Sequence, residues 1–556
     1  MPNSFSRRKL LQGAVALGMP SLSPLRLAQV KTQSLEAIVS VQNGPFQPNW
    51  ESLSTQQTPE WFQDAKLGLW AHWTAQCVPE QGDWYARSMY IPYAGNEYSG
   101  PEANSKKRTL NNDYEFQCQH YGHPSYHGFK DVDHLWHAQN WNPHALIQLY
   151  KRAGAKYFVA LANHHDNFDC FNSKYQPWNA VNMGPKRDIV GTWAETAREA
   201  GLKFGVTVHA ARTWSWYEVA QGADPDGPFH GMPYDGKMTK ADGKGLWWDG
   251  YDPQDLYAQN HAIGAKPDKA YCDKFFNRVI DLIDYYHPDL LYFDDYVMPL
   301  YDTDPSYGLR IASHYYNSSA ARNGGKSEVV MTGKNLNDAQ RKAITWDIER
   351  GLADKIEPFH WQTDTCIGDW HYSKWIYDHK AYKTSKLVIH MLIDIISKNG
   401  NLLLNIPVKG DGTIDSEEHR IVTELGDWME INHAAIHGTR PWGVYGEGPD
   451  FDRAQSGKAN SGNFNEGSQG YSSADVRYVT RGSHVLYAFI LGWPTDGQVL
   501  LKSLANGAAN LPGKVKSVHL LGDDRNLVFE QTGSGLKLTM PNAPPCKSAY
   551  AFKINF

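Results

Sequence analysis

Cysteine is scarce in this chain of 556 residues: its six cysteines lie far apart and form no Cys-x-x-Cys pair. This spacing is not that of a zinc knuckle or a redox dithiol. We expect buried free thiols, although disulfides stay open if the chain is exported. Heptad and Gly-x-y repeats are also missing, which excludes coiled-coil and collagen-like proteins.

Positive charge is not concentrated anywhere. The 54 Lys and Arg residues are scattered among 60 Asp and Glu, and the formal net charge is −6. Without a basic stripe to neutralise phosphates, nucleic acid is not an expected partner. Aromatic residues, in contrast, are plentiful, with 20 Trp and 31 Tyr. Their broad faces suit the apolar faces of sugar rings.

Long apolar runs are missing beyond the N-terminus, so no membrane span is predicted. Ser6-Arg7-Arg8-Lys9 precedes an apolar run from Leu10 to about Met19, and Leu25–Ala28 could hold a cleavage site. This pattern resembles a twin-arginine signal, and a chance arginine pair is the alternative. We expect residues 1–28 to be an export signal and the mature protein to be soluble, in the periplasm or outside the cell.

Helix and strand signals alternate through the first three quarters of the chain. Asn142 is placed as an N-cap, Pro143 as the first helical residue and Gly154 as the stop, and a strand signal follows at 156–161. Similar units cover 188–208, 275–293 and 387–406. Repeated units with short turns favour a (β/α) barrel over residues 35–440, with an open doubly wound sheet as the alternative.

The helical period disappears after Pro441. Residues 446–473 are rich in Gly, Asn and Ser, as a loop or domain boundary is. Short alternating runs follow at 476–479, 484–490, 515–521, 536–540 and 549–554. They predict an antiparallel β-sandwich over residues 441–556, packed against the barrel as a stabilising domain.

Polar side chains follow several of the predicted barrel strands. The carboxyl ends of parallel strands meet at one rim, where an active site forms. The residues at these ends are His72, His164, His165, His209, Asp294 and Asp295. A glycosidase would need two carboxyl groups here, and a metal hydrolase would need converging ligands. Neighbouring residues such as His164 and His165 point apart on a strand, so we expect neither a metal nor a cofactor.

Several stretches resemble one known family, in the same order along the chain. They are Leu67-Gly68-Leu69-Trp70-Ala71-His72-Trp73, Asp83-Trp84-Tyr85, Asn163-His164-His165-Asp166-Asn167-Phe168, Pro288-Asp289-Leu290-Leu291-Tyr292-Phe293-Asp294 and Asn401-Leu402-Leu403-Leu404-Asn405-Ile406-Pro407. On these residues the chain resembles the α-L-fucosidases of glycoside hydrolase family 29. The resemblance implies an exo-acting retaining enzyme without a cofactor, whose partner is a fucosylated oligosaccharide or glycoconjugate.

The resemblance also implies roles for residues. Asp294 would be the nucleophile, and Glu349 is the expected acid/base. Asp364 and Asp369 are the alternatives for the acid/base. The expected sugar-binding residues are His72, Asp83, Trp84, Tyr85, His164, His165, His209 and Trp214. The family commonly has Glu where Gln362 stands, which leaves an inactive carbohydrate-binding descendant open. Among glycosidases, a fucan-directed or α-L-galactosidase-like enzyme is the nearest alternative function.

Overall fold

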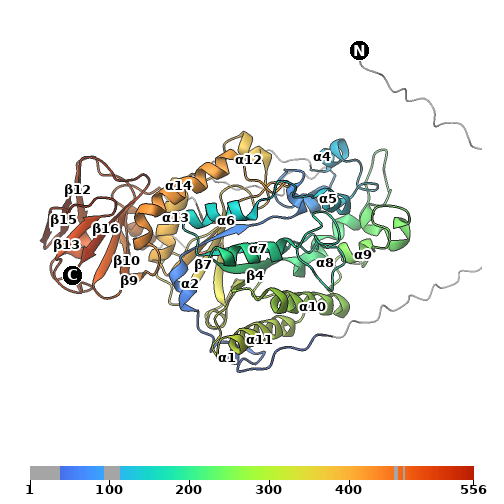
Figure 1. The fold of residues 1–556 in the computed structure, drawn as a ribbon, viewed down its shortest axis with the longest axis horizontal. Helices are drawn as coiled ribbons and strands as arrows, with labels where there is room; N and C mark the ends of the chain where they lie inside the picture. Colours follow the sequence, from blue (N-terminus) through green and yellow to red (C-terminus); the bar gives the residue numbers. More distant parts are fainter. Residues whose placement is uncertain (1–37, 93–112, 259, 456–460, 467–469) are drawn as a thin grey trace, which may run out of the picture. The chain divides into compact units, whose positions relative to one another are not determined.

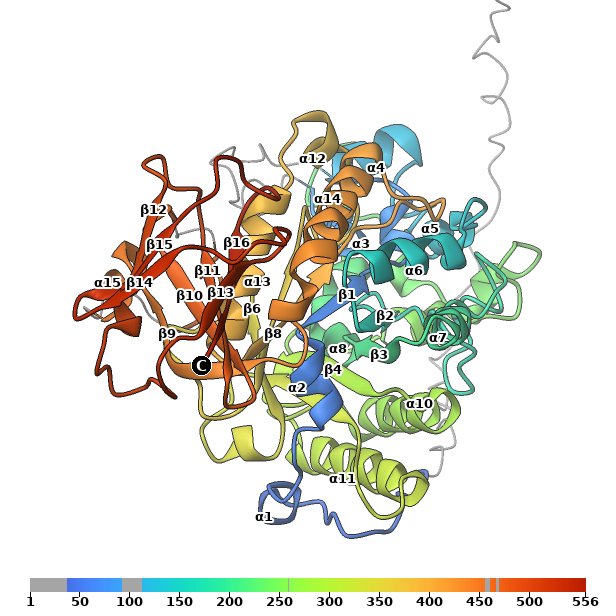
Figure 2. The ribbon, with the colours of Figure 1, turned by 60° about the vertical axis from the view of Figure 1, so that its left-hand side comes forward.

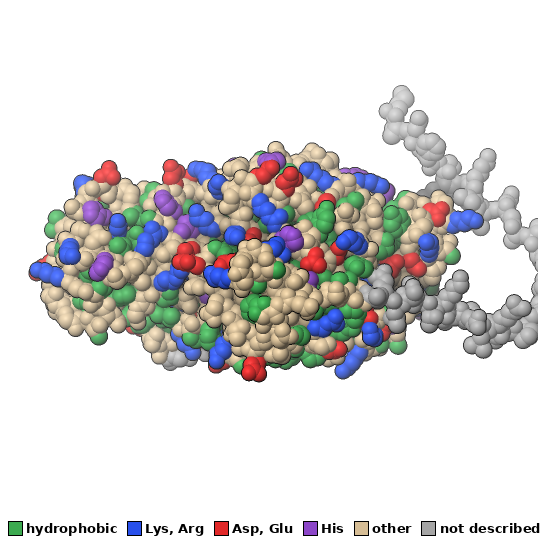
Figure 3. Space-filling model, turned by 60° about the horizontal axis from the view of Figure 1, so that its bottom comes forward, with side chains coloured by type: hydrophobic (Ala, Val, Ile, Leu, Met, Phe, Trp, Pro, Cys, Tyr) green, Lys and Arg blue, Asp and Glu red, His purple; other side chains and the backbone are tan. Residues whose placement is uncertain are grey.

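The computed structural model describes residues 38–92, 113–258, 260–455, 461–466 and 470–556, all within the compact unit Ile38–Phe556. The predicted export signal at 1–28 lies outside the described residues. No described helix is both long and apolar enough to cross a membrane. On the face drawn in Figure 3, basic and acidic side chains are interspersed and form no stripe of one sign.

Eight parallel strands close into a barrel, in the order in which they occur along the chain. Their bounds are β1 (Leu67–Ala71), β2 (Tyr157–Asn163), β3 (Lys203–Val208), β4 (Leu290–Tyr296), β5 (Val330–Lys334), β6 (Thr345–Glu349), β7 (Trp361–Cys366) and β8 (Gly400–Asn405). Strand β1 pairs with both β2 and β8, which closes the sheet. The predicted barrel is confirmed, and the open sheet is excluded.

Long helices connect most neighbouring strands and lie outside the barrel (Figure 1). They are α6 (Pro143–Arg152), α7 (Ile189–Glu199), α10 (Lys269–Tyr286), α11 (Pro305–Arg322), α13 (Ser385–Ser397) and α14 (Ser416–Asn432). Helix α6 begins as predicted, because the Asn142 side chain accepts a hydrogen bond from the Ala145 N–H. Only the 3-10 turn η6 (Gln340–Lys342) lies between β5 and β6, and residues 350–360 between β6 and β7 are not helical.

Shorter helices occupy the N-terminal segment, the loops around the rim and, in the case of α15, the connection between β9 and β10. They are α1 (Trp50–Leu53), α2 (Glu60–Ala65), α3 (Tyr85–Ser88), α4 (Asp113–His120), α5 (Phe129–Leu135), α8 (Thr213–Trp216), α9 (Pro253–Leu256), α12 (Lys374–Asp378) and α15 (Pro449–Arg453). The long connection after β3 is tied to α5 by the buried Asp235, which lies 3.0 Å from the Lys130 ammonium. Tyr257 also donates a hydrogen bond to Asp235, at 2.6 Å.

The C-terminal region forms two antiparallel sheets around a separate hydrophobic core, as expected for a sandwich (Figure 2). The five-stranded sheet has the order β13 (Ser517–Leu520), β16 (Tyr550–Asn555), β11 (Val485–Ile490), β10 (Val476–Arg481), β9 (Arg440–Glu447). The three-stranded sheet has the order β12 (Gln498–Leu501), β15 (Gly535–Thr539), β14 (Phe529–Thr532). Strands β9, β12 and β14 were not predicted, because they are short or interrupted by Pro and Gly.

A buried ion cluster joins helix α13 to strand β10. Arg477 and Asp394 are fully buried, and the Arg477 Nε lies 2.6 Å from Asp394 Oδ1. Lys398 Nζ lies 2.7 Å from Asp394 Oδ2. Burial raises the pKa of Asp394, but the charges of Lys398 and Arg477 outweigh it and leave that pKa below its usual value.

All six cysteines of the chain are free thiols.

Asp394→Asn should lower the free energy of unfolding by about 3–5 kcal/mol, because it removes the carboxylate that Lys398 contacts and one of the two that Arg477 contacts, the other being Asp450. Denaturant unfolding of purified protein measures this. Asp523→Asn is the matched control, since it breaks the exposed contact with Arg525 and should have no measurable effect. Equal stability of the two variants would contradict a structural role for the cluster.

Candidate active site

Histidines from the first three barrel strands meet at one end of the barrel. His72 follows β1, His164 and His165 follow β2, and His209 follows β3. The His72 ring centroid lies 5.1 Å from that of His164 and 5.2 Å from that of His209. All four side chains are buried, with at most 3% of their surface exposed. The structure therefore brings together the predicted strand-end histidines.

Asp294, on β4, lies beside two of these histidines. Its Oδ2 lies 3.3 Å from His165 Nε2 and 3.3 Å from His209 Nδ1. The other nitrogen of His165, Nδ1, is 2.8 Å from the His209 carbonyl oxygen, which fixes the ring orientation. Burial lowers the pKa of His209 to about 4, so its ring is neutral at pH 7. The Asp294 side chain keeps 19% of its surface exposed, so a ligand can approach it.

Lys334, the last residue of β5, connects Asp294 to Glu349 at the end of β6. Its Nζ lies 2.6 Å from Asp294 Oδ1 and 2.6 Å from Glu349 Oε2. The two carboxylate oxygens therefore cannot be farther apart than twice that distance. Sequence reasoning missed Lys334, although the apolar Val329-Val330-Met331 just before it was a strand signal.

The two carboxyl groups have opposite pKa shifts. Burial raises the pKa of Asp294, but the Lys334 charge and the contacts with His165 and His209 outweigh it and hold that pKa well below its usual value. Burial raises the pKa of Glu349 to about 7, against the lowering effect of Lys334 and with a further raising effect of Asp294. At slightly acidic pH, Asp294 is thus ionised and Glu349 is protonated.

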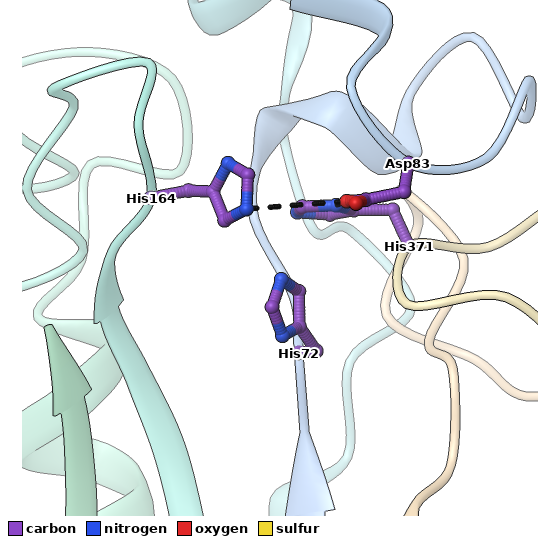
Figure 4. A group of neighbouring side chains, drawn as sticks. All are labelled: His72, Asp83, His164 and His371. Carbon is purple, nitrogen blue, oxygen red and sulfur yellow. Dashed lines mark hydrogen bonds and ion pairs between the residues drawn. The ribbon is translucent and has the colours of Figure 1, made fainter. Parts of the chain in front are cut away.

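A second cluster lies next to this pair, where His72, Asp83, His164 and His371 point toward one another (Figure 4). Asp83 Oδ1 lies 2.5 Å from His371 Nδ1 and 3.9 Å from His164 Nε2. Burial, followed by the nearby Asp369, holds the pKa of Asp83 well above its usual value. Burial also holds the pKa values of His72 and His164 well below their usual value. Both ring nitrogens of His72 are buried, and neither has a hydrogen-bond partner among the described residues.

Two groups in the described part of the chain have the composition and spacing to hold a cation. They are His72, Asp83, His164 and His371, and His164, His165 and His209. The expectation that His164 and His165 point apart is wrong: both lie beyond the end of β2, where the alternation of a strand no longer applies, and their ring centroids are 4.5 Å apart. Several of these nitrogens already face protein groups. His371 Nε2 lies 2.9 Å from the Thr74 hydroxyl, and His164 Nδ1 lies 2.8 Å from Gln76 Nε2. Such an arrangement also suits hydrogen bonding to sugar hydroxyls.

The predicted aromatic residues are not all placed near these clusters. The Trp84 ring lies 6.4 Å from that of His165. Trp214 instead stacks on His261, at 3.8 Å, and Trp216 lies 5.4 Å from His165. The buried Tyr85 hydroxyl donates to Gln117 Oε1, at 2.6 Å. Trp216 was missed because the sequence did not give the bounds of α8. Without them, it could not show which of the two Trp residues in this helix, Trp214 or Trp216, lies near the histidines.

The other polar residues considered from the sequence, Gln362, Asp364, Asp369 and Asp295, are buried, with at most 9% of their surface exposed. Gln362 is buried within β7, where it donates to Asp347 Oδ2 at 2.7 Å and accepts from the Tyr157 hydroxyl at 3.0 Å. Asp364 accepts from the Tyr292 hydroxyl, at 3.0 Å. Burial and then the Asp294 charge hold the pKa of Asp295 well above its usual value. The Gln362 position therefore lies in a buried hydrogen-bond network of the barrel wall.

Comparison with known proteins gives consistent matches over nearly the whole chain. The family model for alpha-L-fucosidase matches residues 33–434, and that for the alpha-L-fucosidase C-terminal domain matches residues 470–555. Tissue alpha-L-fucosidase of Rattus norvegicus is 25% identical over 522 residues, which cover 92% of each chain. Plasma alpha-L-fucosidase of Homo sapiens is 26% identical over 526 residues, again covering 92% of each chain.

Solved structures share the fold. The alpha-fucosidase of Thermotoga maritima in complex with a mechanism based inhibitor has a TM-score of 0.66 and 23% identity, covering 92% of this chain and 100% of that one. Alpha-L-fucosidase isoenzyme 1 of Paenibacillus thiaminolyticus has a TM-score of 0.58 and 20% identity, covering 89% of this chain and 98% of that one. With the strand-end histidines and carboxyl groups at one rim, the family-model matches show that this chain belongs to the α-L-fucosidase family and is a glycoside hydrolase acting on O-glycosyl bonds.

Proposed function

We propose that this protein is a retaining, exo-acting α-L-fucosidase in which Asp294 is the nucleophile and Glu349 the acid/base. The contact of one ammonium group with both carboxyl groups carries this proposal. Retaining glycosidases place their two carboxyl groups about 5 Å apart, whereas inverting enzymes leave room for a water between them. The opposite pKa shifts of the two groups fit an ionised nucleophile and a protonated acid.

The reaction has two steps. An Asp294 carboxylate oxygen attacks the anomeric carbon of fucose, the bond to the leaving oxygen breaks, and Glu349 gives that oxygen its proton. The ionised Glu349 then takes a proton from water, whose oxygen attacks the anomeric carbon and releases Asp294. Lys334 stabilises each carboxyl group while it is ionised, and the neutral His209 ring can donate a hydrogen bond to Asp294.

A terminal fucose fits the groups around the carboxyl pair. The unpartnered nitrogens of His72 and the nearby Asp83 and His164 can donate to and accept from sugar hydroxyls. Trp84 and Trp216, whose rings lie 5.9 Å apart, can offer apolar surface to the C6 methyl group. We therefore propose a fucosylated oligosaccharide or glycoconjugate as the substrate.

The position of Gln362 supports an active enzyme over an inactive carbohydrate-binding descendant. Its amide has two partners in the barrel wall, and Glu349 offers a carboxyl group beside Asp294. A fucan-directed or α-L-galactosidase-like enzyme would use the same carboxyl pair, and pocket shape would separate these substrates. We also propose export through residues 1–28, a catalytic domain over 35–440 and a sandwich domain over 441–556, as the sequence pattern indicates.

Azide should distinguish the roles of the two carboxyl groups. Asp294→Ala should lose on the order of 10⁴-fold or more in kcat/KM on 4-nitrophenyl α-L-fucoside, and Glu349→Ala should lose less on this activated substrate. Azide attacks in place of Asp294 with one inversion, which gives the β-azide. In Glu349→Ala it replaces water after glycosylation, which gives the α-azide.

Product NMR reads these configurations, and Asp289→Asn is the control. Asp289 precedes the same strand and pairs with Lys203 at the opposite end of the barrel, so this variant should keep its activity. The same azide anomer from both active-site variants would contradict the assignment.

The pH profile of kcat/KM should fall as pH rises through about 7, because Glu349 loses the proton that it must donate. Lys334 lowers the pKa of Glu349, so Lys334→Met should move this limb to higher pH while reducing the maximum rate. Initial rates on an aryl fucoside across pH measure both effects. A limb that stays in place or moves to lower pH in Lys334→Met would argue against Glu349 as the acid.

Turnover should be unchanged after dialysis against EDTA, because the clustered histidines would bind hydroxyl groups and not a catalytic metal. Rates before and after dialysis, with and without added Zn²⁺, measure this. Loss of activity with EDTA and recovery with Zn²⁺ would instead favour a metal-dependent hydrolase.

A further inference from the structure

The end of strand β6, where Glu349 lies, is only partly paired within the barrel. Among the described residues, β5 pairs with β6 at two positions, Thr332 with Thr345 and Gly333 with Trp346. On the other side, β7 continues its pairing up to Glu349. Because the pairing with β5 stops at Trp346, the backbone of Glu349 needs another partner on the β5 side.

Residues 461–466, which we call the strap, supply that partner. Glu349 donates its backbone N–H to Asn463 Oδ1, at 3.1 Å, and its carbonyl oxygen accepts from the Phe464 N–H, at 2.9 Å. Both backbone groups of Glu349 are thus bonded to two consecutive strap residues. The strap comes from the connection between β9 and β10, more than a hundred residues beyond Glu349 in the chain.

The strap is anchored on both sides of this contact. Leu352 and Gly462 form an antiparallel bridge, and the Leu352 N–H donates to Asn465 Oδ1 at 2.7 Å. The two backbones approach so closely that a Cβ atom on Gly351 would lie 2.0 Å from the Gly462 carbonyl oxygen. The strap therefore runs directly against the residues that follow Glu349.

A buried ion cluster fixes the other end of the strap. Glu466 Oε1 lies 2.8 Å from Arg350 Nε and 2.8 Å from Lys383 Nζ, and the Thr365 hydroxyl donates to its Oε2 at 2.5 Å. The Glu466 side chain is 7% exposed. Burial raises the pKa of Glu466, but Lys383 and Arg350 outweigh it and keep the carboxyl group ionised. Arg350 directly follows Glu349, so this cluster fixes the peptide bond that joins Glu349 to Arg350.

We propose that the strap is a positioning element for the acid/base, with Asn463 and Glu466 as its positioning residues. The inference rests on the proposed role of Glu349. The strap sets the backbone from which the Glu349 carboxyl group reaches the leaving oxygen. A shift of the order of 1 Å in a catalytic group is enough to lower a rate about 100-fold.

Leaving-group dependence separates this role from a purely structural one. An activated leaving group such as 4-nitrophenolate departs with little protonation, whereas an alkyl leaving group needs the acid. In Asn463→Ala and Glu466→Gln, kcat/KM should fall by about 10-fold or more on methyl α-L-fucoside and by less than about 3-fold on 4-nitrophenyl α-L-fucoside. Asn463→Asp keeps the oxygen acceptor and should stay near wild type on both substrates.

Glu447→Gln is the control for loss of a buried carboxylate. Glu447 accepts from the Lys502 and Ser503 N–H groups within the sandwich and should show no leaving-group dependence. Asn463 is exposed, so its variants test the inference even if Glu466→Gln does not fold. An equal loss on both substrates, or no loss on either, in Asn463→Ala would overturn the inference. Glu349→Ala is measured in parallel: if it lacks leaving-group dependence, the acid/base assignment itself fails.

Discussion

The Lys334 ammonium, 2.6 Å from a carboxylate oxygen of Asp294 and 2.6 Å from one of Glu349, is the contact on which the proposed chemistry depends. A buried cation between two carboxyl groups reduces the repulsion that would otherwise prevent both from approaching one substrate. Its charge does not act alone, because His165 and His209 also contact Asp294. This asymmetry accounts for the opposite pKa shifts, with Asp294 kept ionised and Glu349 titrating near neutral pH.

The barrel determines how this asymmetry arises. Asp294, Lys334 and Glu349 stand at the ends of three consecutive strands, β4, β5 and β6, so neighbouring strands place them side by side. The histidines come from β1 to β3, on the other part of the same rim. A sugar that contacts both sets would lie with its anomeric carbon at Asp294 and its hydroxyl groups toward His72 and His164. The leaving group would then lie on the side of Glu349, the residue that the strap contacts.

The sequence was most informative where local signals are strong. Helix α6 could be predicted from Asn142, Pro143 and Gly154, because caps and stops act over a few residues. Asp294 could be proposed because it directly follows an apolar strand within a family-like stretch. Lys334 could not be assigned in the same way, since its partners Asp294 and Glu349 lie 40 and 15 positions away in the chain. The strap could not be predicted either, because a Gly- and Asn-rich connection has the composition of a surface loop.

The stereochemistry of the first product shows whether the reaction passes through a covalent intermediate on Asp294. Proton NMR of wild-type enzyme hydrolysing 4-nitrophenyl α-L-fucoside can record the anomer that appears before mutarotation. We expect α-L-fucose to appear first and the β-anomer only later, because two displacements at the anomeric carbon restore its configuration. Initial release of β-L-fucose would mean a single displacement by water, and it would contradict a covalent intermediate on Asp294.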